Sequence, residues 1–499
     1  MISQSCSQPK TQVLDIQELF QHIAYHLDTK SLHKLPRVSK KLYNRFRNLP
    51  LAFWKTFPDR HIITLADSYS CCHALPGMLL KKSGIFSNKF VNLYYNQIRN
   101  QLFTRFTFPI VLKLTSTPTS WNEHSVNAII TKVLSFCRFE ETQIIGLSFN
   151  SINGPNESDL EKLIRSNPLL FNNLEFLKIT GYKTSKKIQN LLVSACPNLR
   201  ALELETTIPK VTLQKFSQYK NLEYIKLIDT NPDLTPDIIE NFAKNNPRLS
   251  RINIDECQFI SDYIIQTIAK AFNTRLTHLN IALPQERHRL YIYPLSSLSL
   301  QALAHYCKNL EFLDLSNWEL NEACINLLIN NFSNLNKLVL ERTKPRSHQL
   351  LTDLILSKKD RLRELTLIED ATFSNYPNKI FSAIAQCHRL EKLTLRHSNK
   401  ISKDTFRTIL ENNKALIHLN LQTQTNLSET LIQIAPHLSH IEALDLSFCR
   451  YLSEESIFAI LENCTKLKYL NISYTKISNR LENKLKKYKS KTNIFNSHF

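Results

Sequence analysis

The sequence predicts an α/β solenoid in which short parallel strands form one sheet, helices cover its convex side, and a small all-α domain comes first. Three observations predict this fold. The chain has 499 residues, which is too many for a single compact core. A short apolar pattern recurs every 23 to 34 residues along most of it. A helical pattern follows each copy, so one strand and one helix form the repeating unit.

The repeated pattern is a leucine or isoleucine at positions 1, 4 and 6 of a short segment. In LEFLDL at 310–315 the later positions alternate apolar and polar residues, which is the period of a strand with one buried face. A weaker copy begins at Ile144, and Leu112 with Leu114 indicates one more. The twelve clear copies begin at Leu174, Leu199, Leu222, Leu249, Leu276, Leu310, Leu335, Leu362, Leu390, Leu416, Ile441 and Leu467.

The second half of each copy predicts an amphipathic helix. In LTPDIIENFAKN at 234–245, Thr235 stands where an N-cap is expected and Pro236 at the first helical position, followed by apolar residues on one face. The segment ISDYIIQTIAKAF at 260–272 follows the same rule.

Glycine is scarce, with five residues in the chain and none after Gly181. No two glycines have the spacing of a phosphate-binding loop or a dinucleotide fingerprint, which argues against nucleotide-dependent enzymes of the common folds. Turns beyond Gly181 must use Asn, Asp, Pro or Ser. We therefore expect the same turn conformation to recur in many repeats.

The net charge of +20 is concentrated at the two ends of the chain. The first 100 residues carry 14 basic and 5 acidic groups, and residues 476–499 carry 7 and 1. A phosphate-binding groove would place this charge on the body, so we expect no nucleic-acid partner. No apolar run approaches the length of a membrane span, and residues 1–11 are too polar for a secretory signal. We expect a cytoplasmic protein.

Six of the eleven cysteines keep the register of the repeat. Four lie three residues before the first leucine of a copy and two lie three residues after its last apolar residue, which predicts reduced thiols in the stacked core. Cys71 and Cys72 lack zinc-spaced partners, and His22 with His26 lack the glutamate of a metalloprotease motif. We expect no metal, no cofactor and no catalytic residue. The six are Cys196, Cys257, Cys307, Cys387, Cys449 and Cys464.

Segments such as CPNLRALEL at 196–204 and CKNLEFLDLSN at 307–317 resemble the cysteine-containing class of leucine-rich repeat proteins. The resemblance covers residues 105–475. It implies a horseshoe whose strands line a concave face that binds protein partners.

Residues 13–60 do not fit the repeat and predict three short helices, too few to bury much apolar surface alone. This segment resembles an F-box, the module that docks substrate receptors on the adaptor of a cullin-RING ubiquitin ligase. It departs from that pattern in its opening, where Asp15-Ile16 replaces the usual Leu-Pro. The other reading is a helical cap on the open end of the repeats. The resemblance implies adaptor contacts by Leu19, Phe20, Ile23, Leu27, Leu32, Val38, Leu42 and Trp54.

The predicted domain order is a flexible N-terminus (1–12), the F-box-like domain (13–60), a partly helical connector (61–104), the repeats (105–475) and a basic tail (476–499). Alternate strand residues point away from the core and are free to encode a partner. An insertion around 283–297 offers a second contact surface. Aromatic and cationic residues at concave positions predict substrate contacts by Tyr224, Arg251, His278, Phe312, Lys337, Lys392, Arg396 and Tyr469.

The leading functional hypothesis is a non-catalytic substrate receptor of an SCF-type ubiquitin ligase, with an adaptor, a cullin and a protein substrate as partners. A repeat-bearing ligase with its own catalytic cysteine is disfavoured, because only about 25 residues follow the last copy and an independent fold needs about 100. A scaffold or effector without ligase contact is the alternative. Abundant Lys, Asn and Ile with few glycines also suggest a bacterial effector that mimics a host F-box protein and acts in the host cytosol.

Overall fold

In the computed structural model two compact units divide the chain, Met1–Tyr224 and Ile225–Phe499, and their boundary falls inside strand β6 (Tyr224–Ile228). The structure describes residues 62–65, 110–114, 144–150, 157–180, 185–205, 209–228, 234–257, 260–284, 295–343, 347–368, 377–396, 401–424, 427–475, 485 and 493–495.

The first unit contains parallel strands that pair in chain order. Parallel neighbours need a crossover connection, which α10 and α11 supply in turn after β4 and β5. The strands are β1 (Ile62–Leu65), β2 (Ile110–Leu114), β3 (Ile144–Asn150), β4 (Phe176–Thr180) and β5 (Ala201–Glu205). The helices are α8 (Glu157–Ser166), α9 (Pro168–Asn172), α10 (Lys186–Ala195) and α11 (Lys210–Phe216).

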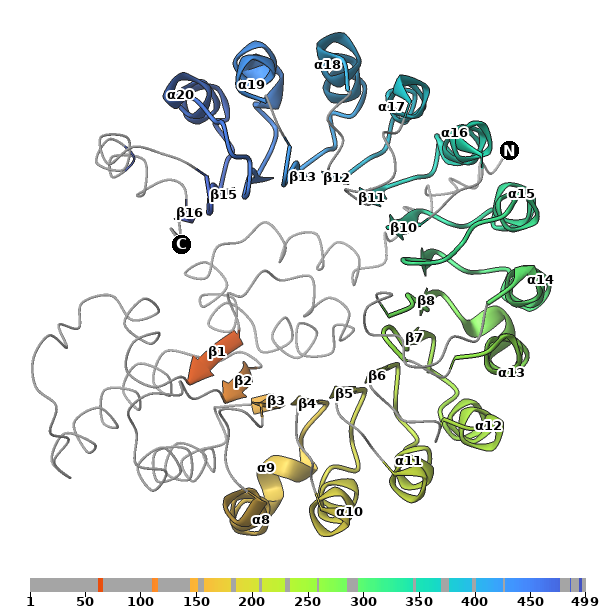
Figure 1. The fold of residues 1–499 in the computed structure, drawn as a ribbon. Coiled ribbons are helices and arrows are strands. Elements are labelled where there is room, and N and C mark those ends of the chain that lie inside the picture. Colours follow the sequence, from red (N-terminus) through yellow and green to blue (C-terminus); the bar gives the residue numbers. More distant parts are fainter. Residues whose placement is uncertain are drawn as a thin grey trace, which may run out of the picture. The chain divides into compact units, whose positions relative to one another are not determined.

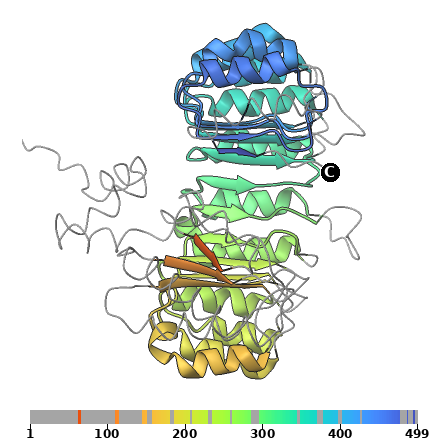
Figure 2. The same ribbon diagram turned by 90° about the vertical axis from the view of Figure 1, so that its left-hand side faces the viewer.

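The second unit repeats the same strand and helix, and its strands from β7 to β16 are parallel and in chain order. Its helices lie together on one side of the sheet (Figures 1 and 2). The strands are β7 (Arg251–Asn253), β8 (His278–Asn280), β9 (Phe312–Asp314), β10 (Lys337–Glu341), β11 (Glu364–Ile368), β12 (Lys392–Arg396), β13 (His418–Asn420), β14 (Ala443–Asp445), β15 (Tyr469–Asn471) and β16 (Asn493–Phe495). The helices are α12 (Pro236–Asn245), α13 (Asp262–Phe272), α14 (Ser297–Tyr306), α15 (Glu322–Asn331), α16 (His348–Lys358), α17 (Asn378–Ile384), α18 (Lys403–Asn412), α19 (Ser428–Ile434) and α20 (Glu454–Asn463), with 3-10 turns η4 (Asn273–Arg275) and η6 (Ala435–Leu438).

The predicted α/β repeat array is confirmed. Each of the twelve clear copies forms a strand, from β4 to β15, that begins two residues after its leading leucine or isoleucine. The weaker copies at Ile144 and at Leu112 form β3 and β2. The predicted small all-α domain at 13–60 lies outside the described residues.

Two strands occur where the sequence did not predict them. Strand β1 lies in the segment 61–104, for which a partly helical connector was expected, and pairs with β2. Strand β16 lies in the basic tail and pairs with β15. The remaining domain boundaries stay predictions.

The core of each unit lies between its sheet and its helices. Leu310, Leu313 and Leu315, at positions 1, 4 and 6 of one copy, are 1%, 0% and 0% exposed. The helices contribute residues such as Ile265 and Ile268, which are buried at 0% and 1% exposure. Full burial of such a side chain contributes about 1.5 to 3 kcal/mol, and the repeat makes this contribution many times.

The start of α12 follows the predicted rule with one difference. Thr235 is the N-cap of α12 and Pro236 its first residue, as predicted. The Thr235 hydroxyl, however, donates to the Asp237 carboxylate rather than accepting from a helix N–H. Serine caps such as Ser402, which accepts from the Thr405 N–H at 3.2 Å, behave as a capping residue should.

The turns after five of the described strands share one arrangement, as the scarcity of glycine predicted. An Asn or Asp side chain at the strand end accepts from the N–H two residues on, and the next residue adopts positive φ. At Asp445 the first distance is 2.9 Å and Phe448 has φ 60°. The Phe448 N–H then donates to the Ser473 carbonyl of the following repeat at 2.9 Å. The same arrangement occurs after Asn253, Asp314, Asn420 and Asn471, with positive φ at Glu256, Asn317, Thr423 and Tyr474.

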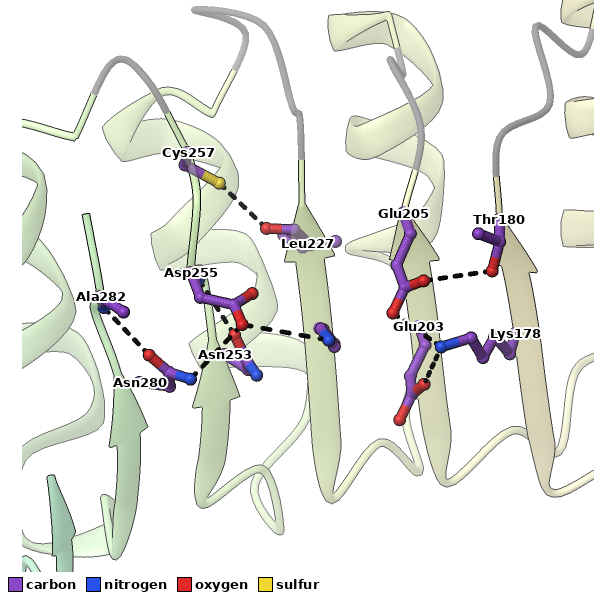
Figure 3. Close-up of polar contacts among 11 residues, drawn as sticks. Lys178, Thr180, Glu203, Glu205, Leu227, Asn253, Asp255, Cys257, Asn280 and Ala282 are labelled. Carbon is purple, nitrogen blue, oxygen red and sulfur yellow. Dashed lines mark hydrogen bonds and ion pairs between the residues drawn. The ribbon is translucent and has the colours of Figure 1, made fainter. Parts of the chain in front are cut away.

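The side chain one residue after the positive-φ position bonds back to the preceding repeat. The Cys257 thiol donates to the Leu227 carbonyl at 3.0 Å, as Figure 3 shows. Cys449 does the same to Leu421 at 3.2 Å. In other repeats the donor is the indole of Trp318 or the amide of Gln424, each 2.9 Å from a carbonyl of the preceding strand. Three chemically different groups, a thiol, an indole and an amide, thus satisfy one recurring buried acceptor.

The register cysteines are buried thiols, as predicted. Cys196, Cys307 and Cys464 end helices α10, α14 and α20. Burial raises the pKa of each of these three thiols to about 12, so they are protonated at neutral pH. The same holds for Cys387 and Cys449. In the part of the chain that the structure describes, no helix is long and apolar enough to cross a membrane.

The stacked core generates a test of the strand register. Leu313 lies between Leu279 and Leu338 in the pairing of β8, β9 and β10. Replacing Leu313 by Asp buries an unpaired charge, which we expect to cost more than about 4 kcal/mol and to lower the melting temperature sharply in far-UV circular dichroism. The control is Thr366→Asp. Thr366 is half-buried and lies on the face of β11 opposite to the buried leucines of that strand. Equal melting of the two variants would contradict the register.

Candidate functional site

The candidate site is the face of the second unit's sheet that carries no helix among the described residues, here called the open face. Along each strand the burial alternates, with the buried side chains facing the helices and half-buried ones facing away. Strand pairing brings the first residues of consecutive strands into one line, here called the first row. It consists of Arg251, His278, Phe312, Lys337, Glu364, Lys392, His418, Ala443 and Tyr469.

The first row contains a shared ion pair. The Glu364 carboxylate accepts from Lys337 Nζ at 2.8 Å and lies 3.3 Å from Lys392 Nζ, both through Oε1. Burial works against this charge, but Lys392 and Lys337 together hold the pKa of Glu364 below its usual value. One carboxylate serves two ammonium groups, so the triad keeps a net positive charge.

The other part of the row is aromatic. The rings of His278 and Phe312 are stacked with their centroids 5.8 Å apart. Burial, with Arg251 and Lys337 nearby, lowers the pKa of His278 to about 3, so its ring is neutral at neutral pH. Together with Arg251 this gives an aromatic and cationic surface of the composition that protein interfaces favour.

A second row of side chains, two residues along each strand, is mostly occupied by the turn-forming Asn and Asp. Burial raises the pKa of Asp314 to about 6, with Asp255 and Glu341 adding to the shift. Ser316 donates to this carboxylate at 2.6 Å and limits the shift. Asp255 lies 4.0 Å from the ammonium of Lys226. The Asn and Asp side chains of this row accept hydrogen bonds within the turns, so fewer of their polar atoms are free to bind a ligand.

A groove of about 520 Å³ lies on the open face over β12 to β15. It lies where the small Ala443 separates His418 from Tyr469 in the first row. Burial and the Lys392 charge lower the pKa of His418, so this ring is neutral too. The lining residues are Lys392, Leu393, Thr394, His418, Leu419, Asn420, Ala443, Leu444, Asp445, Tyr469 and Asn471. The volume is within the range of ligand pockets.

The first unit has its own polar contacts on the corresponding strand positions. Figure 3 shows Lys178 on β4 reaching Glu203 and Glu205 on β5, with Nζ to carboxylate distances of 3.3 and 2.7 Å. Although burial opposes it, the hydrogen bond to Glu205 raises the pKa of Lys178. Arg200 bridges Glu175 and Glu223 at 3.2 and 2.7 Å. These charges are paired within the unit and act as structural contacts between repeats.

The predicted substrate residues are distributed unevenly. Arg251, His278, Phe312 and Lys337 are consecutive in the first row. Lys392 and Tyr469 lie further along the same row and line the groove. Arg396 ends β12, and Tyr224 belongs to the first unit. The insertion's central residues and all eight predicted adaptor contacts lie outside the described residues.

Glu364, His418 and Ala443 are site residues that the sequence reasoning missed. They occupy position 3 of their copies, as Lys392 does. An alignment of the copies therefore held the signal. The selection of aromatic and cationic residues excluded the acid and the alanine, and it left out His418 although histidine fits that selection. Among the described residues no cluster of His, Cys, Asp and Glu is arranged to hold a metal ion.

The fold and the open face define a parallel array of the leucine-rich repeat type. No protein-family model matches the sequence. Among solved structures, the chain is similar to one described as the crystal structure of the Rad7 and Elc1 complex in yeast. The likeness covers 82% of this chain and 91% of that chain at 14% identity, with a TM-score of 0.47. It is too distant to carry an argument about partners or activity.

The neutral state of His278 generates a pH prediction. The unfolded ring titrates near pH 6.5 and the folded ring near 3, so only the unfolded chain takes up this proton between those values. Stability should therefore fall as pH drops below about 6.5, and His278 should account for up to about 2 kcal/mol of the loss between pH 7 and pH 5. Urea unfolding of wild type and His278→Asn at both values measures this share. An equal loss in the two proteins would contradict a buried, neutral ring.

Proposed function

We propose that this chain is the substrate-recognition subunit of a cullin-RING ubiquitin ligase. In this proposal the segment 13–60 acts as an F-box and docks on the ligase adaptor. The open face binds the protein that is to be ubiquitinated. The chain positions its partners and performs no bond chemistry itself.

The substrate-binding part of the proposal rests on the composition and alignment of the first row. Its half-buried aromatic and charged side chains are aligned by one strand register and lie on the face away from the leucine core. Side chains that are fixed in position but free in type suit recognition of a partner. The combination of Arg251, His278 and Phe312 is typical of interface anchors.

The ligase half is supported by the sequence alone. The residues Glu18, Leu19 and Phe20, with Trp54 at the end of the segment, resemble an F-box, and an F-box followed by leucine-rich repeats is a known domain order. A non-catalytic role agrees with the chemistry of five described thiols, those of Cys196, Cys307, Cys387, Cys449 and Cys464, whose raised pKa values keep them protonated and poor nucleophiles. If the chain is a secreted bacterial effector, the ligase would be the host's.

The proposal as a whole is tested by affinity purification of the full chain from a eukaryotic cytosol. We expect the adaptor and a cullin to co-purify. Capture of other proteins without adaptor or cullin would favour the scaffold alternative, in which 13–60 is a cap on the repeats.

The substrate-binding half predicts the effect of a triple substitution. Replacing Arg251, Phe312 and Lys392 by Ala should weaken substrate capture, while the free energy of unfolding changes by less than about 2 kcal/mol, because all three side chains are partly exposed. Quantitative capture and thermal unfolding measure the two effects.

A matched control removes one aromatic residue, one lysine and one arginine from the helix side. Tyr263, Lys403 and Arg407 lie on helices α13 and α18 with exposed side chains. Their replacement by Ala should leave capture unchanged. If both triple variants capture substrate as wild type does, the open face is not the binding surface.

The adaptor-binding half predicts the effect of Leu19→Ala combined with Phe20→Ala. If both side chains are buried against the adaptor, their loss costs on the order of 4 to 8 kcal/mol, enough to abolish a micromolar complex. Adaptor binding should disappear in a pull-down while substrate capture and melting of the repeats persist, because repeats pack only on their neighbours. Retention of adaptor binding by this variant would show that 13–60 is not an F-box.

A further inference from the structure

The groove over β12 to β15 has a donor-rich end. Lys392 pairs with His418, and Thr394 pairs with Asn420, in the register of β12 and β13. These four residues form a block that presents an ammonium, an imidazole N–H, a hydroxyl and an amide group to the groove. The Asn420 oxygen is occupied, because it accepts from the Gln422 N–H at 3.0 Å. Its amide hydrogens remain available.

The charge at this end is positive. The side chain of Lys392 is 42% exposed. Its Nζ lies 3.3 Å from Glu364 Oε1, whereas the Nζ of Lys337 lies 2.8 Å from the same oxygen. With one carboxylate between two lysines, one positive charge is left without an internal partner of its own. An acidic group placed over the block would meet this charge and the neighbouring donors.

The other end of the groove is a hollow over Ala443. This residue stands between His418 and Tyr469 in the first row, so a methyl group separates two rings. Neighbouring strands lie about 4.8 Å apart, which puts the two flanking strands roughly 10 Å apart. That space accepts one bulky apolar side chain between the rings.

The one acid in the groove is already satisfied. Asp445 accepts from the Ser447 N–H at 2.9 Å, from Gln422 Nε2 at 2.6 Å and from Asn471 Nδ2 at 3.1 Å. It lies on β14, two strands away from Lys392. Three hydrogen bonds occupy its two oxygens, although it lies beside Asn420 in the register of β13 and β14. An acidic ligand group therefore belongs at the β12 end, next to Lys392.

We propose that this groove binds an extended acidic peptide segment, with a carboxylate over the Lys392 and Asn420 block and a bulky apolar side chain in the hollow over Ala443. This inference rests on the proposed function, since it names the class of substrate that the open face would capture. Strands β12 and β14 are about 10 Å apart and an extended chain advances about 3.3 Å per residue. The two recognised residues are therefore about three positions apart.

The probe is a short fluorescein-labelled peptide of serine and alanine with one glutamate and, three positions away, one phenylalanine. Fluorescence anisotropy with the full chain should show binding that weakens at high salt. Replacing the glutamate by glutamine should weaken binding about tenfold, because a charge-assisted hydrogen bond is lost. Replacing the phenylalanine by serine, or moving it next to the glutamate, should also weaken it.

Two pairs of variants test the site itself. Lys392→Ala should weaken binding about tenfold, whereas Lys403→Ala should not, although both side chains are 42% exposed and each is paired with a glutamate. Ala443→Phe should fill the hollow and abolish binding. Val339→Phe, on the open face but outside the groove, should leave binding intact.

Several outcomes would overturn the inference. These are equal binding of the glutamine or lysine versions of the peptide, equal loss with Lys392→Ala and Lys403→Ala, or displacement of the peptide by free glutamate alone, which would indicate a small-anion site. Failure of every peptide while the substrate-capture triple variant still loses capture would reject the groove's specificity and leave the proposed function standing. Failure of the proposed function would instead appear as absent adaptor binding and unaltered capture.

Discussion

One lateral register between neighbouring strands is the constraint on which the rest of this structure depends. A slip by a single residue would turn each strand's leucines to the open face and its polar residues into the core. The pairing of Leu313 with Leu279 and Leu338 prevents this, since each is at most 1% exposed. The same pairing aligns the side chains on the other face. The first row is thus a consequence of core packing, and its members are fixed in place by residues that never touch a partner.

Hydrogen bonds at the turns that follow the strands also hold that register. Phe448 has φ 60°, a conformation that costs a residue with a Cβ roughly 1 to 2 kcal/mol. It persists because its N–H bonds to Ser473 in the next repeat while the Asp445 side chain closes the turn. The donor position one residue later bonds back to the preceding repeat, as Cys449 does to Leu421. Four repeats, those with Cys257, Trp318, Gln424 and Cys449, are joined to both neighbours at this turn, and the conformation matters more than the residue type.

This distinction explains how much the sequence could predict. Leucines at positions 1, 4 and 6 give a periodic signal, so the strands, the helices and the buried cysteines were predictable from the chain alone. Strands β1 and β16 were not, because three or four residues outside a clear copy carry too little pattern. On the open face the sequence predicted which positions face outward, and therefore Arg251, Phe312 and Lys392. It did not predict their partners, because the Glu364 ion pair joins residues 27 and 28 positions apart through the register.

The groove shows why a site is harder to predict than a fold. An alanine lies in the first row at Ala443, and another occupies the corresponding position of β5 in the first unit, Ala201, paired with Phe176. Ala201 is 0% exposed, whereas Ala443 is half-buried and opens into the groove. The same small residue beside an aromatic one therefore gives a covered position in one unit and a hollow in the other. Position in the repeat decides which way a side chain points, but only the surrounding side chains decide whether space remains above it. A recognition surface on such an array arises where a small residue interrupts a row of larger ones, and its chemistry is set by which polar groups the turns leave unused.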